Sequence, residues 1–164
     1  MQLKEYIIHQ MSEAKREMIE AVKDLPADAV SSMKPGGHWP IGWIVQHCCQ
    51  NADFFLYEHM TGKSVLEHDE RYRGWPLKEP KPEDIYPSSE KLIERWSAVW
   101  DAVIAEFRKL DESSISEKLH GREPLAESCL RVINHANSHL RAIWCLLGEQ
   151  RVDSKYPEQQ TWLA

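Results

Sequence analysis

The sequence predicts an all-α protein, an up-down-down-up four-helix bundle with a long crossover between its second and third helices. Three observations indicate this class. Four stretches of about 20 residues repeat apolar side chains at the three- and four-residue spacing of a helix. No stretch shows the strict apolar–polar alternation of a half-buried strand. The connection at residues 62–87 is proline-rich and polar, and a segment of that length can run the full length of a bundle.

Composition and charge narrow the class of protein further. A chain of 164 residues is long enough for one domain with a sizeable core, expected over residues 1–164. The net charge of −6 argues against nucleic-acid binding, which normally needs a basic surface. Because no apolar run approaches about 18 residues, no membrane span is expected. A water-soluble enzyme or binding module fits these limits.

The cysteines and the N-terminus favour a cytoplasmic protein. The four cysteines form no C-x-x-C motif, and neighbouring Cys48 and Cys49 have poor geometry for a mutual disulfide. The first ten residues are charged and amphipathic, unlike a signal peptide. We therefore expect reduced thiols, with Cys48 in the core and Cys49 partly exposed.

The first helix is predicted over residues 2–24, where Pro26 follows and ends it. Its apolar stripe consists of Leu3, Ile7, Met11, Ala14, Met18 and Val22. His9 lies off this stripe and is expected in solvent. Residues 25–39 are expected to form a connection rich in turn residues.

The second helix is predicted from Pro40 to about Met60, with Gly62 as its C-terminal stop. His47 lies beside the apolar stripe of this helix, one turn before Asn51. Two readings of Asn51 are open, because its amide could orient a ligand or be a satisfied polar core residue. His59 near the helix end, and His38 before the helix, are expected to have structural or rim positions.

The third helix begins after Ser88, a good N-cap, and the fourth opens at Pro124 and ends at Gly148. Residues 111–122 connect them as a short polar segment, and residues 149–164 form a polar tail. In the long crossover before the third helix, Trp75 and Tyr86 are expected to pack on the surface. The apolar stripe of the third helix contains Leu92, Trp96, Val99, Val103, Phe107 and Leu110.

The fourth helix carries the residues that point to chemistry. His135 and His139 are four residues apart, so their imidazoles lie on one helical face, one turn apart. Two readings fit this pair: ligands of one metal ion, or hydrogen-bonded histidines of the core. The neighbours on that face are apolar: Val132, Ala136, Ile143 and Leu146.

A third histidine strengthens the metal reading. His47 lies near the middle of the second helix, and the bundle topology can bring it to the pair on the fourth. Three neutral imidazoles bind a divalent ion and leave positions open for water or substrate, and both Zn²⁺ and Ni²⁺ suit them. A di-iron site is rejected, since it needs two Glu-x-x-His repeats and only Glu117 and His120 fit, in a connection.

Two motifs resemble a known family. HWPIGWIVQH at residues 38–47 and HANSH at residues 135–139, in this helix order, resemble the DinB/YfiT-like superfamily of metal-dependent four-helix bundles. The resemblance covers residues 1–148. It implies that His47, His135 and His139 are the metal ligands, that the ion is nickel or zinc, and that the protein is a homodimer. Its characterised members include thiol S-transferases using bacillithiol, mycothiol or glutathione, and a thiol-dependent isomerase.

We therefore predict a metal-dependent enzyme that acts on a small-molecule substrate, with thiol S-transferase-like chemistry on a small electrophile. The ion would lower the pKa of a bound low-molecular-weight thiol and so give a nucleophile at neutral pH. Three alternatives remain: a metal-dependent hydrolase, a non-catalytic module that binds a metal or small molecule, and a structural dimer with satisfied core histidines. No catalytic base is predicted.

Overall fold

The computed structural model describes residues 2–32, 39–66, 80–81, 84–117 and 123–150. These residues form helices and contain no strand, which confirms the all-α class. Trp75, His38 and residues 151–164 lie outside the described residues. None of the helices in the described ranges is long and apolar enough to cross a membrane. The elements in chain order are α1 (Leu3–Val22), α2 (Ala27–Ser31), α3 (Ile41–Ala52), η1 (Asp53–Tyr57), α4 (Glu58–Thr61), α5 (Ser89–Lys109), α6 (Glu112–Ser116) and α7 (Leu125–Gln150).

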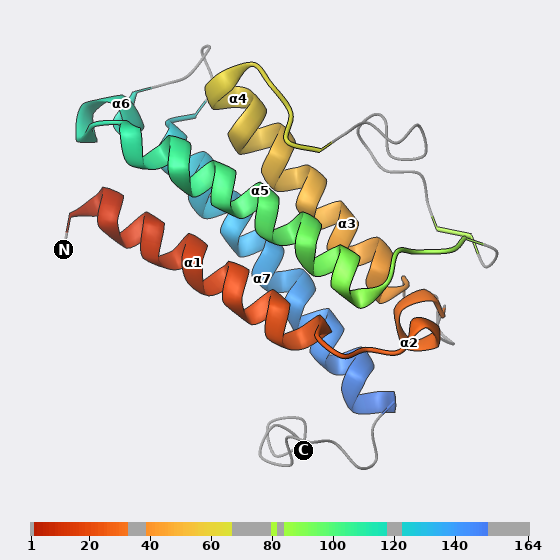
Figure 1. Cartoon of the computed structure of the whole chain (residues 1–164). Coiled ribbons are helices and arrows are strands. Elements are labelled where there is room, and N and C mark those ends of the chain that lie inside the picture. The colour runs from red at the N-terminus through yellow and green to blue at the C-terminus, as the bar shows by residue number, and fades with distance from the viewer. Residues whose placement is uncertain (1, 33–38, 67–79, 82–83, 118–122, 151–164) are drawn as a thin grey trace.

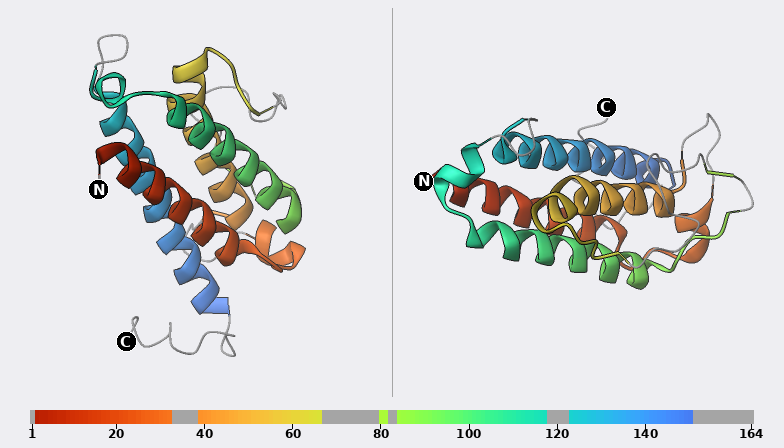
Figure 2. Two further views of the ribbon diagram at one scale, coloured as in Figure 1. Left: turned by 60° about the vertical axis from the view of Figure 1, so that its left-hand side comes forward. Right: turned by 90° about the horizontal axis from the view of Figure 1, so that it is seen from above.

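Four long helical columns lie side by side: α1, the continuous α3–η1–α4 column, α5 and α7 (Figures 1 and 2). Helix α1 packs against α5 and α7, and α3 packs against the same two helices. Figure 1 shows α1 and α7 running in one direction while α3 and α5 run in the other. The middle of α3 therefore lies beside the middle of an oppositely directed α7, which positions the candidate site.

The core is built from the apolar stripes that the sequence predicts. On α1, Ile7, Met11 and Met18 are buried, whereas Leu3, the first residue of that helix, is 44% exposed. On α5, the buried set includes Trp96, Trp100 and Phe107. Ser88 caps this helix by accepting a hydrogen bond from the Lys91 backbone N–H. Tyr86, expected to hold the crossover on the surface of the bundle, is itself buried in the core.

The second predicted helix is confirmed in extent, but its middle is a π-helix over Asp53–Tyr57. Gly62 adopts the left-handed conformation, with φ of 70°, that ends the column. The buried Asp53 carboxylate accepts hydrogen bonds from the backbone N–H groups of Val65 and Leu66, at 2.9 and 3.2 Å. The column and the segment that follows it are thereby joined.

Three local expectations were wrong. The connections at 25–39 and 111–122 each contain a five-residue helix, α2 and α6, too short to show a period and anchored by one buried residue each, Val30 and Ile115. Helix α7 continues past Gly148 to Gln150. Cys49 is buried, not partly exposed, because it lies on the side of α3 that faces Arg95 of α5.

Gly42 is required where α3 meets Tyr86, ahead of α5, and Val30 of α2. A Cβ atom at Gly42 would lie 2.5 Å from Tyr86 Cβ and 3.0 Å from Val30 Cγ1. We expect Gly42→Ala to lower the free energy of unfolding by about 1–3 kcal/mol, because overpacking outweighs the better helix propensity of alanine. Urea denaturation measures this change. A variant as stable as the unaltered chain would contradict the close approach.

Candidate metal centre

The three histidines predicted from sequence come together between α3 and α7. His47 Nε2 lies 3.0 Å from His135 Nε2, and His139 Nε2 lies 3.2 Å from the same atom. One ring nitrogen from each histidine falls within a group whose members are all within 4.8 Å of one another. Within the described ranges, this cluster contains no cysteine, aspartate or glutamate.

The convergence of ring nitrogens fits a divalent ion better than a set of hydrogen bonds. An imidazole nitrogen has a single in-plane direction, used either to donate or to accept. His135 Nε2 faces two other Nε2 atoms at once and can pair properly with only one of them. Ligand nitrogens at 2.0–2.1 Å from a tetrahedral ion lie about 3.3 Å apart, close to both observed separations. The residues present therefore fit a common ion.

The electrostatics of the cluster keep the imidazoles neutral. Burial, followed by the charges of His135 and His139, lowers the pKa of His47 to about 4. Burial likewise lowers the pKa of His135 to about 4, with smaller contributions from His139 and Arg131. The pKa of His139 is lowered by burial as well. At neutral pH all three lone pairs are thus available to a metal ion.

These lowered pKa values predict acid sensitivity of the metal-free protein. In the unfolded chain the histidines take up protons near pH 6.5, whereas in the folded state His47 and His135 stay neutral down to about pH 4. The unfolded state therefore binds more protons in this window, and the free energy of unfolding falls as the pH drops through it. Thermal melts of metal-free protein at successive pH values measure this loss.

The control is a variant in which glutamine replaces all three histidines. This variant keeps every acidic group of the chain, so any difference from the unaltered protein comes from the histidines. We expect its melting temperature to change less between pH about 6.5 and about 4 than that of the unaltered protein. Equal slopes for the two proteins would contradict the neutral, buried state of the cluster.

Aromatic side chains form a stack that leads from the surface to the cluster. The Trp43 and His47 rings stack with centroids 4.8 Å apart and planes 13° apart. Trp39 packs on Trp43 with ring centroids 4.0 Å apart and is 39% exposed. Stacking fixes the orientation of the His47 ring. Sequence reasoning missed this arrangement, although the four-residue spacing of Trp39, Trp43 and His47 could have indicated it.

The other described histidines, His9 and His59, and the thiol of Cys48 are not part of this cluster. His9 is exposed on α1, as predicted, and His59 is half-buried in the last turn of α4. His120 lies outside the described residues, like His38, so their expected positions stay predictions. Cys48 is in the core as predicted, and no described cysteine forms a disulfide.

Comparison with known protein families places the whole site in one family. The family model for the DinB superfamily matches residues 10–143, which include His47, His135 and His139. The chain belongs to the DinB superfamily. This match confirms the resemblance seen in the two histidine motifs. The DinB-like helical chain and its three-histidine cluster together fit a metal-binding site. No curated protein matches the chain.

Proposed function

We propose that this DinB-superfamily chain is a cytoplasmic metalloenzyme, an up-down-down-up four-helix bundle that binds one Ni²⁺ or Zn²⁺ ion through His47, His135 and His139. The proposed reaction is thiol S-transfer to a small electrophilic substrate. The observation that most supports the proposed metal site is the approach of two ring nitrogens to His135 Nε2, at 3.0 and 3.2 Å. Three neutral nitrogen ligands leave at least one position of such an ion for an exogenous ligand.

A bound divalent ion would lower the pKa of the thiol that coordinates it. In the transfer, the thiol would give its proton to solvent water, its sulfur would bond to the electrophilic carbon, and the leaving group would depart with the bonding electron pair. The chain holds the three imidazoles in the neutral form by burial and fixes the His47 ring against Trp43. Neutral ligands leave the full charge of the ion to act on the thiol.

The cosubstrate and the assembly are further parts of the proposal. A low-molecular-weight thiol of the bacillithiol, mycothiol or glutathione type is the proposed donor, and a homodimer is the proposed assembly. Neither nucleic acid nor a membrane is a proposed partner, in keeping with the net charge of −6. Light scattering on the purified protein tests the dimer.

The experiment that tests the function begins with elemental analysis of protein purified without an affinity tag. We expect about one equivalent of nickel or zinc per chain. Metal-loaded protein is then assayed with each of the three thiols and a small electrophile. Thiol consumption that depends on the metal supports the proposal, whereas substrate turnover without any thiol would reassign the protein as a hydrolase. No metal after incubation with excess Zn²⁺ and Ni²⁺ would overturn it.

A further inference from the structure

Asn51 is a buried polar side chain whose amide oxygen has no hydrogen-bond partner among the described residues. Its side chain is 5% exposed, and its Oδ1 atom is fully buried with no donor among the residues that the structure describes. Buried amide oxygens in native proteins are nearly always paired, because burial without a partner is unfavourable. An unpaired oxygen one turn from His47 favours the reading in which Asn51 orients a ligand over the reading as a satisfied core residue.

The packing of α3 on α7 places Asn51 beside the histidine cluster. One turn before it on α3, His47 contacts His135 of α7. One turn after it, the Phe55 ring lies under the Arg131 guanidinium, 5.0 Å from the ring centroid. Arg131 precedes His135 by one turn of α7. These two contacts lie one turn on either side of Asn51, so Asn51 lies where the α3–η1 column packs on α7, one turn from His47.

The backbone around Asn51 is also unusual. The regular helix α3 ends at Ala52, and the π-helix η1 begins at Asp53. A π-turn adds a residue to one turn; such turns are rare and occur frequently at functional sites. Here the change of winding begins at Asp53, two residues after Asn51.

We propose that the Asn51 side-chain amide is a positioning residue of the metal centre, whose Oδ1 accepts a hydrogen bond from the exogenous ligand beside His47 and His135. This inference rests on the proposed metal site. The ligand class that it selects is a small molecule with an N–H or O–H group to donate near its coordinating atom. A neutral amide suits this role because it orients such a group without adding a charge to the site.

Gln46 offers a matched control on the same helix. It is 4% exposed, and neither of its side-chain amide atoms has a partner among the described residues. It lies one turn after Gly42, on the face of α3 that meets Tyr86 and Val30, whereas Asn51 lies one turn after His47. Asn51→Leu and Gln46→Leu therefore remove the same kind of buried amide, one beside the cluster and one on another face of α3.

The test uses Co²⁺-loaded protein and two probes, imidazole and 1-methylimidazole. Both coordinate through one nitrogen, but only imidazole keeps an N–H to donate. The Co²⁺ absorption spectrum reports the binding of each probe. We expect Asn51→Leu to weaken imidazole about 3- to 10-fold relative to 1-methylimidazole, as the loss of one hydrogen bond predicts. Gln46→Leu should leave the ratio of the two affinities unchanged.

A second measurement, the thermal melt of the metal-free proteins, separates positioning from a structural role. Asn51→Leu should melt at the same temperature as the unaltered protein or higher, because an apolar side chain of similar volume replaces an unpaired amide. A clearly lower melting temperature would overturn the proposal, and so would an unchanged probe ratio in protein that binds Co²⁺. Failure of the unaltered protein to bind Co²⁺ would instead overturn the metal site itself, and this inference with it.

Discussion

Replacing His135 by alanine is expected to abolish metal binding. His135 Nε2 is the central atom of the cluster, close to the Nε2 atoms of both His47 and His139. Its loss leaves two nitrogen ligands from two different helices and removes the 3.0 Å approach of the His135 and His47 ring nitrogens. Outer-shell partners of metal ligands are worth about 10- to 100-fold in affinity, so loss of a direct ligand should exceed about 100-fold.

Titration calorimetry with Zn²⁺ and Ni²⁺, together with elemental analysis, measures this change. The matched control is His9→Ala, which removes an exposed histidine of α1 away from the cluster and should leave metal content and affinity unchanged. Circular dichroism verifies that both variants keep their helices. Retention of a full equivalent of metal by His135→Ala would show that the ion binds at another place, and would contradict the assignment of the centre.

The cluster could be predicted because it depends on only two properties of the chain. The four-residue spacing of His135 and His139 fixes their common face on any helix. The position of His47 in the middle of its helix is then enough to bring it to the pair, because α3 and α7 run in opposite directions and pack together (Figure 1). Neither property depends on the fine detail of side-chain packing, and so periodicity and helix order were enough.

The missed features depend on packing that no periodic pattern encodes. The burial of Cys49 depends on where α5 lies relative to α3, which its own helix does not specify. The π-helix at Asp53–Tyr57 leaves the apolar pattern of the column almost unchanged, so the sequence reads as one regular helix there. For Asn51 the sequence left two readings open, and only the absence of a partner among the described residues separates them.

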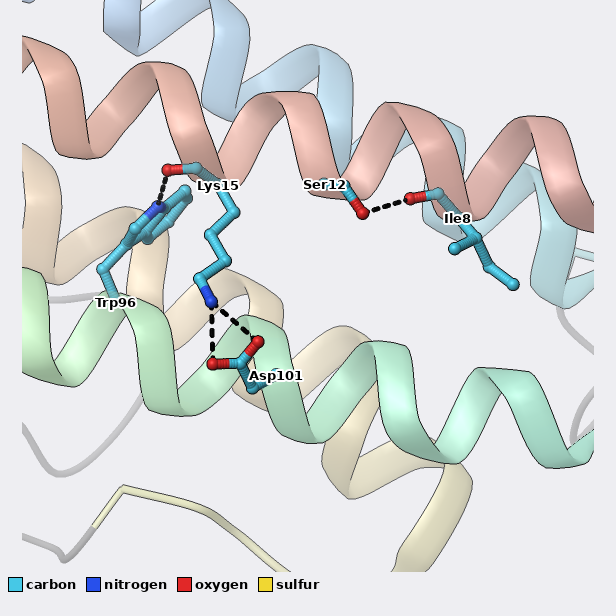
Figure 3. Close-up of polar contacts among 5 residues, drawn as sticks. All are labelled: Ile8, Ser12, Lys15, Trp96 and Asp101. Atoms are coloured by element: carbon cyan, nitrogen blue, oxygen red, sulfur yellow. Dashed lines mark hydrogen bonds and ion pairs between the residues drawn. The ribbon is translucent and has the colours of Figure 1, made fainter.

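Trp96→Ala is expected to have the largest effect on stability. The Trp96 side chain is 1% exposed, and its ring meets that of Trp100 with centroids 5.4 Å apart. Its indole Nε1–H donates to the Lys15 backbone carbonyl of α1 at 3.0 Å, which joins α5 to α1 (Figure 3). Truncation leaves a cavity between these helices and removes their hydrogen bond, so we expect the free energy of unfolding to fall by about 3–5 kcal/mol.

Two further variants separate the contributions to this contact. Trp96→Phe keeps much of the packing but loses the hydrogen bond to Lys15, and should cost less than Trp96→Ala. Lys15→Ala removes the ion pair between Lys15 Nζ and Asp101 Oδ1, which are 2.7 Å apart (Figure 3). Because the Asp101 side chain is largely exposed, the free energy of unfolding should fall by less than about 1 kcal/mol. Urea denaturation ranks the three variants. A Lys15→Ala loss as large as that of Trp96→Ala would contradict the view that buried packing, and not the surface ion pair, holds α1 to α5.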